Sequence, residues 1–239
     1  MIPTNVLNQR TPRPVDLTQI GFGGAPLGNL YRRIDEDVAQ ATLDAAWEVG
    51  IRYFDTAPQY GLGRSEMRFA KGLRRFEGDA LTLSTKVGRL LEHVAPEDVP
   101  PEAFVDVPQK QIVFDYTYDA IMRSFDSSVA RLETDQIDLL LLHDLDAGTH
   151  GQEGEDHNLR QLFSEGGYRA LTELRNSGRI AGIGAGVNTW QICSRLLGEA
   201  DFDGFLLAGR VYVAGTRTFG QLSTTLHRTR CRDHSGRTI

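Results

Sequence analysis

The chain has 239 residues, of which 40% are hydrophobic and 24% are charged, and its formal net charge is −6. This size and composition predict one globular domain, close in length to a (β/α)₈ barrel. The negative charge argues against nucleic-acid binding, and the lack of a long apolar run argues against a membrane span. Two cysteines, Cys193 and Cys231, form no disulfide framework, and the N-terminus has no signal-peptide pattern, so we expect a cytoplasmic protein.

The first half of the chain alternates short apolar runs with helix-like segments. The predicted elements are a strand and glycine turn over 18–28, a helix over 35–50, a strand over 51–57, a helix over 63–75 and a strand over 80–87. The 3.6-residue spacing in the first helix predicts an inner face of Val38, Thr42, Ala45 and Val49. A long irregular stretch with four prolines is expected over 88–116.

The second half continues the same alternation. A helix with Ile121, Phe125, Val129 and Leu132 on its inner face precedes a buried strand over 137–144. The segments that follow are predicted as a loop over 145–160, a helix over 166–178, a strand over 179–188, a helix over 189–200 and a strand over 202–209. The histidines His150 and His157 flank an acidic EGED segment, which we interpret as a solvated loop and not as a metal site.

Alternating strands and helices predict an α/β fold with a parallel sheet. Periodicity alone fits a doubly wound open sheet and a closed barrel equally well. Four polar residues stand at or just after the ends of four different strands: Asp55, Lys86, His143 and Asn188. A barrel gathers such residues on one rim, whereas an open sheet binds ligands where its strand order reverses. We therefore predict a TIM barrel with about six of its eight β/α units present.

The segment YFDTAPQYG places Tyr60 five residues after Asp55, and STKVG and LLHD supply Lys86 and His143. A tyrosine has a reference pKa of about 10, and a nearby lysine ammonium favours its phenolate. A carboxylate beside the lysine would hold it charged, and a neutral imidazole would orient a substrate oxygen. Each residue alone is more often a surface charge or a cap. Together they predict a tyrosine acid/base centre that acts on a carbonyl or alcohol oxygen.

These segments resemble the aldo-keto reductases from about Gln19 to Gly209. GFGGAPLG is similar to the first strand and loop of that family, and FDTAPQYG, STKVG and IDLLLLHD are similar to its catalytic motifs. The resemblance implies Tyr60 as acid/base, Asp55 and Lys86 as the pair that tunes it, and His143 as the substrate orienter. It also implies hydride transfer with NAD or NADP, with cofactor contacts from Gly23, Gly24, Asp55 and Asn188. A plain tight turn explains the two glycines equally well.

The segments HDLDAGTHG, GVNTWQIC and DFDGFLLAGR resemble a narrower branch, the D-threo-aldose 1-dehydrogenases, also called L-fucose or galactose dehydrogenases. This resemblance implies oxidation of an aldose such as L-fucose or D-arabinose to a lactone, by a monomer or weak dimer. Pyridoxal 4-dehydrogenase activity and a non-catalytic, barrel-derived binding protein are the alternatives. GIGAGVN has the glycine spacing of a dinucleotide loop, but a lone match of this kind is weak.

The last 29 residues, 211–239, differ from the body of the chain. They contain five Arg, one Asp and no Lys or Glu, a formal charge of +4, which leaves −10 on residues 1–210. A basic nucleic-acid arm should also contain lysines and a recognisable motif. We predict instead that residues 211–239 are read out of frame, that 1–210 is an incomplete barrel, and that the 239-residue chain is impaired or inactive.

Overall fold

The computed structural model describes residues 2–7, 13, 15–76, 80–100, 103–134 and 137–208. The predicted out-of-frame tail over 211–239, with Cys231, lies outside the described residues. Within the described part, no helix is both long and apolar enough to cross a membrane.

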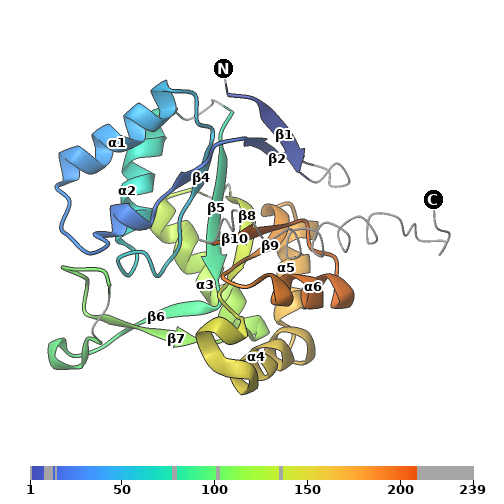
Figure 1. Cartoon of the computed structure of the whole chain (residues 1–239). Coiled ribbons are helices and arrows are strands. Elements are labelled where there is room, and N and C mark those ends of the chain that lie inside the picture. Colours follow the sequence, from blue (N-terminus) through green and yellow to red (C-terminus); the bar gives the residue numbers. More distant parts are fainter. Residues whose placement is uncertain are drawn as a thin grey trace, which may run out of the picture.

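A parallel sheet of six strands, in the spatial order β10-β9-β8-β5-β4-β3, is the centre of the described fold (Figure 1). Its strands are β3 (Phe22–Gly23), β4 (Tyr53–Asp55), β5 (Thr82–Val87), β8 (Ile137–His143), β9 (Ile180–Val187) and β10 (Gly204–Leu207). Each strand pairs with the next parallel strand along the chain, so the order never reverses. Among the described strands there is therefore no switch point of the doubly wound type, and the sheet is a partial α/β barrel.

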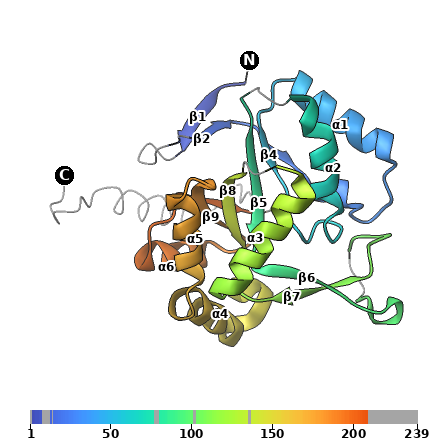
Figure 2. The same ribbon diagram turned by 180° about the vertical axis from the view of Figure 1, so that it is seen from behind.

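Helices connect the parallel strands and cover the outer face of the sheet. They are α1 (Glu36–Glu48), α2 (Arg64–Leu73), α3 (Tyr118–Leu132), α4 (Ala147–Ser164), α5 (Gly167–Asn176) and α6 (Trp190–Glu199), with short 3₁₀ turns η1 (Ala25–Gly28), η2 (Arg74–Phe76) and η3 (Pro96–Asp98). Figure 2 shows α3 passing in front of β5 and β8, on the side opposite to the view of Figure 1. The predicted strands and all five predicted helices, α1, α2, α3, α5 and α6, are therefore confirmed.

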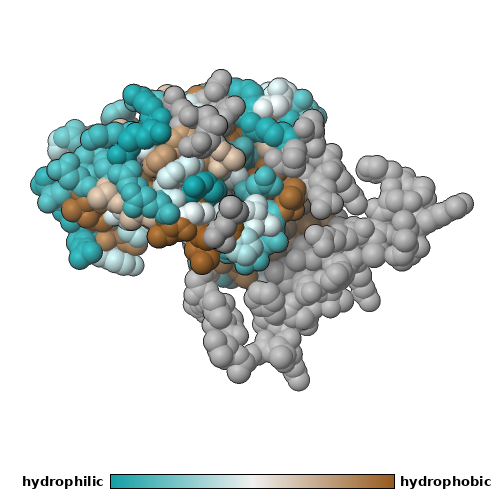
Figure 3. Space-filling model, turned by 90° about the horizontal axis from the view of Figure 1, so that it is seen from above, coloured by the Kyte–Doolittle hydropathy of each residue, from teal (hydrophilic) through white to brown (hydrophobic). Residues whose placement is uncertain are grey.

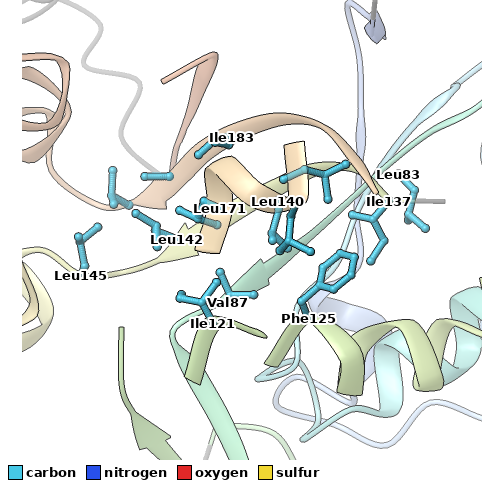
Figure 4. Close-up of a cluster of buried hydrophobic side chains, with 14 of the residues drawn as sticks. Leu83, Val87, Ile121, Phe125, Ile137, Leu140, Leu142, Leu145, Leu171 and Ile183 are labelled. Atoms are coloured by element: carbon cyan, nitrogen blue, oxygen red, sulfur yellow. The ribbon is translucent and has the colours of Figure 1, made fainter. Parts of the chain in front are cut away.

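The hydrophobic core lies between the sheet and these helices (Figure 4). Leu140 and Leu142 of β8 point toward Ile121 and Phe125 of α3, as the spacing predicted for that helix. All four side chains are fully buried, and burial of one such side chain stabilises the fold by about 1.5–3 kcal/mol. Alternation along the strand sends Leu139 to the opposite, inner face of the sheet.

The predicted inner face of α1 is wrong by one residue. Val38 and Val49 are exposed, whereas the buried residues are Ala39, Leu43 and Ala46. The buried residues each follow a predicted one by one position. Adjacent helical positions are 100° apart, so the predicted face is rotated by 100° from the buried face. In the view of Figure 3, the left side of the molecule, where α1 lies in Figure 1, is mostly hydrophilic, with some hydrophobic residues exposed along its lower edge.

An antiparallel hairpin of β1 (Thr4–Leu7) and β2 (Val15–Thr18) lies at the amino ends of the parallel strands (Figure 1). Val15 packs against Leu139 and Ala181 in a small buried cluster inside the curve of the sheet. The sequence analysis did not predict this hairpin. A side chain of the sheet binds the hairpin backbone, since Thr82 Oγ1 of β5 donates to the carbonyl of Asp16 in β2 at 2.7 Å.

The stretch over 88–116, predicted to be irregular, contains an antiparallel pair of strands. These are β6 (Arg89–His93) and β7 (Lys110–Phe114), in a register that pairs the first residue of one with the last of the other. Pro96, Pro100 and Pro108 fall in the connection between the strands, where no ladder hydrogen bond is lost. The prolines predicted a loop correctly but hid the short strands on either side.

The loop predicted over 145–160 is also wrong, because most of it is helix α4. Gly151 has φ of 69° and interrupts the helix with a kink. Glu155 accepts a hydrogen bond from the backbone N–H of Ala147 at 2.7 Å, which satisfies the first N–H group of the helix in place of a local side-chain cap. His150 and His157 therefore lie on a helix and not on a solvated loop.

Candidate active site

Four parallel strands deliver polar side chains to one rim of the sheet, as the sequence predicted. Asp55 and His143 are the last residues of β4 and β8, Lys86 is the second-last residue of β5, and Asn188 follows β9 directly. Parallel strands all point their carboxyl ends to the same side. The fold thus gathers residues that are far apart in the sequence at a single site.

Lys86 is the centre of this group. Its ammonium donates to Asp55 Oδ2 at 2.7 Å, to the carbonyl of Thr56 at 2.9 Å and to the hydroxyl of Tyr60 at 3.0 Å. These three bonds use all three donors of the ammonium. Burial on its own opposes the charged form, but Asp55 and Tyr60 outweigh it, so the pKa of Lys86 lies above its usual range. The lysine therefore stays cationic beside the tyrosine oxygen.

Asp55 is held from its other oxygen by residues that the sequence analysis missed. Ser84 Oγ donates to Asp55 Oδ1 at 2.7 Å, and the Tyr53 hydroxyl lies 3.1 Å from Ser84 Oγ. Burial and the nearby Asp55 raise the pKa of Tyr53 to about 12, so this phenol remains neutral. The two-residue period of a strand could have found Ser84, which shares the inner face of β5 with Lys86.

The position of Tyr60 depends on a close approach of two turns. Tyr60 follows the proline turn after β4, and Gly61 has φ of 67°, which glycine adopts without strain. A side chain at Gly28, in the turn η1, would lie 2.5 Å from the carbonyl carbon of Tyr60. Gly28 therefore allows the turn η1 to pack closely against the backbone of Tyr60.

His143 lies next to Tyr60, with ring centroids 5.9 Å apart and nearly perpendicular planes. The Tyr116 hydroxyl donates to the His143 carbonyl at 2.7 Å and fixes the strand end. Burial lowers the pKa of His143 well below its usual value, and the cations Arg89 and Lys86 lower it further. The imidazole is therefore neutral. Its Nδ1 is buried, and none of the described residues offers it a hydrogen bond.

Next to His143, the rim contains an ion pair that sequence reasoning missed. The Arg89 guanidinium, from β6, donates to Asp144 at 2.5 Å and also to Gln59, and it lies over the ring of Phe114. Arg89 thus joins the residue before Tyr60 to the residue after His143. Gln59 and Asp144 lie within the motifs that the sequence analysis used, but their partner Arg89 lies in the stretch that was predicted to be irregular.

Asn188 and the two candidate glycines differ in how well they would fit a cofactor. Asn188 is exposed, and its Nδ2 donates to Asp144 Oδ1 at 2.8 Å. Gly23 is exposed, and a side chain there would meet nothing within 4 Å. Gly24 is buried, and a side chain there would clash with Ser65 and Phe69. Internal packing therefore accounts for Gly24, while Gly23 and Asn188 leave open space for a ligand at the rim.

The segment GIGAGVN forms most of strand β9 and not a phosphate-binding turn. A side chain at Gly182 would lie 2.8 Å from Leu139, and one at Gly186 would lie 3.1 Å from Lys86 Cε. The glycines of this strand thus make room inside the curve of the sheet for side chains from its neighbours.

The parallel sheet has a polar site at the carboxyl ends of its strands, which is where α/β barrel enzymes have their active sites. Residues 19–205 match the aldo/keto reductase family, and the chain belongs to that family of oxidoreductases. Members generally use NAD(P)H. The exposed Asn188 side chain and the His143 Nδ1, which has no hydrogen-bond partner among the described residues, are compatible with such a cofactor and its substrate.

Among curated proteins, the chain is 45% identical to a pyridoxal 4-dehydrogenase from Microbacterium luteolum, over 81% of this chain and 59% of that protein. It is 40% identical to a D-threo-aldose 1-dehydrogenase from a Pseudomonas species, over 80% of this chain and 56% of that protein. The chain therefore spans a little over half the length of these two relatives.

Among solved structures, the holo form of aldo-keto reductase AKR11C1 from Bacillus halodurans matches with a TM-score of 0.62 and 24% identity, over 86% of this chain and 57% of that chain. Glycerol dehydrogenase AKR11B4 from Gluconobacter oxydans matches with a TM-score of 0.59 and 21% identity, over 84% and 54%. At these identities the likeness supports the fold alone.

Proposed function

We propose that the chain carries the catalytic half of an NAD(P)-dependent dehydrogenase that oxidises a cyclic hemiacetal carbon to a lactone. One observation carries this proposal: the Tyr60 hydroxyl lies 3.0 Å from a buried lysine ammonium that Asp55 keeps charged. A phenol oxygen beside a permanent cation is suited to exchange a proton with a substrate oxygen. A neutral imidazole from His143 completes the set.

In the proposed reaction the bound nicotinamide supplies the hydride acceptor. Tyr60 takes the proton of the substrate C1 hydroxyl, and the Lys86 ammonium stabilises the negative charge on the tyrosine oxygen before that transfer. His143, which is neutral, holds the same substrate oxygen by a hydrogen bond. One C–H and one O–H bond break, and the lactone carbonyl forms in their place. Asn188 would bind the nicotinamide at the rim, and the absence of a side chain at Gly23 would leave room for its ring.

Two curated relatives support the proposed substrate class. Both are named as dehydrogenases, one of an aldose and one of pyridoxal. We propose an aldose such as L-fucose or D-arabinose as the substrate, because HDLDAGTHG and DFDGFLLAGR resemble the aldose branch. Pyridoxal is the second candidate and is favoured by the 45% identity.

The test has two stages on the 239-residue chain. Quenching of NADH and NADPH fluorescence on titration separates a cofactor-binding protein from a binding protein of another kind. A panel of aldoses, pyridoxal and aliphatic aldehydes, followed at 340 nm, then identifies the substrate class. Faster turnover of aliphatic aldehydes than of every sugar and of pyridoxal would contradict the proposal.

The predicted reading-frame error adds a matched comparison. A second construction of the gene, shifted by one base after the Arg210 codon, is tested in the same panel. We expect the chain as printed to bind cofactor weakly and to turn over slowly, and the shifted chain to gain both properties. An ordinary turnover rate of the printed chain would show that the predicted impairment is wrong.

A further inference from the structure

Asp144 has no role in the proposed reaction, yet it contacts four residues, which lie on β6, on α4, on β9 and directly after β9. Its backbone N–H donates to the carbonyl of Gly186 at 2.8 Å, and its own carbonyl lies 2.9 Å from His150 Nε2. Its carboxylate accepts from Arg89 at 2.5 Å and from Asn188 Nδ2 at 2.8 Å. Asp144 also has φ of 45°, in the left-handed region that is rare for residues other than glycine. A strained residue with this many partners is characteristic of a functional position.

The carboxylate dictates which way the Asn188 amide faces. An ionised carboxylate only accepts hydrogen bonds, so the group opposite Asp144 Oδ1 must be the NH₂ of Asn188. The amide oxygen of Asn188 then points away from Asp144. Among the residues that the structure describes, no donor reaches this oxygen, and the side chain is exposed at the rim.

A second aspartate holds a different part of the same residue. Asp146, fully buried, accepts from the backbone N–H groups of Asn188 at 3.1 Å and Thr189 at 3.0 Å. It therefore fixes where the Asn188 backbone lies, while Asp144 fixes which atom of its side chain faces outward. The two roles can be separated by experiment.

We infer that Asp144 is a positioning residue that presents the Asn188 side-chain oxygen as a hydrogen-bond acceptor for the carboxamide N–H of a nicotinamide ring. The inference rests on the proposed function, because the ligand is taken from it. The orientation of the amide, in contrast, follows from contacts within the chain alone. A nicotinamide carboxamide offers both N–H groups and a carbonyl, so a fixed acceptor selects one orientation of the ring substituent.

The test compares two ligands in two variants of the full chain. NADH carries the amide N–H groups, and reduced 3-acetylpyridine adenine dinucleotide has a methyl group in their place. Calorimetric titration gives the ratio of the two dissociation constants. In Asp144→Asn, which tolerates a left-handed backbone, we expect the preference for NADH to fall about two- to tenfold, the equivalent of one neutral hydrogen bond. In the control Asp146→Asn, both affinities should fall together, with the ratio unchanged. An unchanged ratio in Asp144→Asn would overturn the inference.

A second measurement needs no ligand. The side-chain NH₂ signals of Asn188, assigned by their loss in Asn188→Ser, report the order of this amide by NMR. We expect slow solvent exchange in the wild-type chain and exchange at least about tenfold faster in Asp144→Asn, since a held N–H is protected. Exchange as fast as in a free asparagine would contradict the orientation. A protected amide in a chain that binds neither dinucleotide, in the printed and in the shifted reading frame alike, would instead reject the proposed function and the ligand assigned to Asn188.

Discussion

The two ends of the parallel sheet use polar side chains in opposite ways. At the amino end, polar groups bind the backbone: Thr18 Oγ1 accepts from the N–H groups of Arg52 and Tyr53, and Asp138 accepts from the N–H of Leu83 at 2.8 Å. At the carboxyl end, some polar side chains also bind backbone groups, but the central ones bind one another, as in the chain from Asp55 through Lys86 to Tyr60.

This difference separates stability from chemistry. A side chain that satisfies buried backbone groups contributes to folding, because an unsatisfied N–H costs free energy. A buried cluster of charges contributes little net stability but holds reactive groups in place. We therefore expect changes at the carboxyl end to affect turnover most and changes at the amino end to affect only the free energy of unfolding.

The largest effect should come from the phenol at the carboxyl end. Tyr60→Phe removes the proton-exchanging oxygen and leaves the half-buried ring in place. In whichever of the two chains, printed or frame-shifted, turns over substrate, we expect kcat to fall about 10²–10⁴-fold. Cofactor affinity and the urea midpoint should not change. Retention of more than about a tenth of kcat would contradict the assignment of Tyr60.

Lys86→Met should affect both properties, because it leaves the Asp55 carboxylate buried without its cation. Breaking a buried pair in this way costs about 3–5 kcal/mol in the free energy of unfolding. Urea denaturation measures this loss. The matched double variant Asp55→Asn/Lys86→Met removes both charges and should recover most of the stability but none of the activity. A stable single variant would show that the pair is not desolvated.

Thr18→Val makes the corresponding change at the amino end. The new side chain has nearly the same shape but accepts no hydrogen bond, so the N–H groups of Arg52 and Tyr53 lose their partner. We expect a loss of about 1–3 kcal/mol in the free energy of unfolding. Cofactor binding at the carboxyl end should not change. A lower cofactor affinity under conditions where the variant is fully folded would contradict the separation of roles between the two ends.

Two glycines of β9 allow the same substitution at both ends of one strand. Gly182→Ala meets Leu139, and Gly186→Ala meets the Lys86 stem at 3.1 Å. Overpacking of this kind typically costs about 1–3 kcal/mol. Both variants should lose stability, but only Gly186→Ala should also lower kcat, because it displaces the ammonium from Tyr60. Equal kcat in the two folded variants would argue against that coupling.

The smallest effect is a pH dependence of stability through His143. Its pKa is lowered in the folded state by burial and by Arg89 and Lys86, so the unfolded chain binds a proton more readily. Stability from this group is therefore complete above the unfolded pKa of about 6.5 and falls below it, by up to about 1.4 kcal/mol per pH unit. Urea midpoints at pH 7.5 and 5.5 measure the fall. His143→Asn should fall less over the same interval, and an equal fall would mean that other groups cause it.

The candidate site was largely predictable from the sequence, because strand ends and polar residues are both local signals. Asp55, Lys86, His143 and Asn188 were placed at strand ends, and the structure puts them at one rim. The Arg89–Asp144 pair was not predictable, since no local pattern relates a residue of the β6–β7 hairpin to one after β8. The roles assigned to these residues remain predictions.

The sequence by itself determined the alternation of strands and helices, the parallel sheet, and the polar residues that end its strands, because each depends on periodicity within a few residues. Only the tertiary structure decided which face of α1 is buried, that 145–160 is mostly helix, and that strands flank the proline-containing connection. These features depend on partners distant in the chain. Ala39 is on the buried face of α1 because the hydrophobic core and α2 pack against that face. The first N–H group of α4 is satisfied by Glu155, eight residues further along the chain, and not by a local cap. Contacts of this kind have no periodicity, and only the folded chain brings their members together.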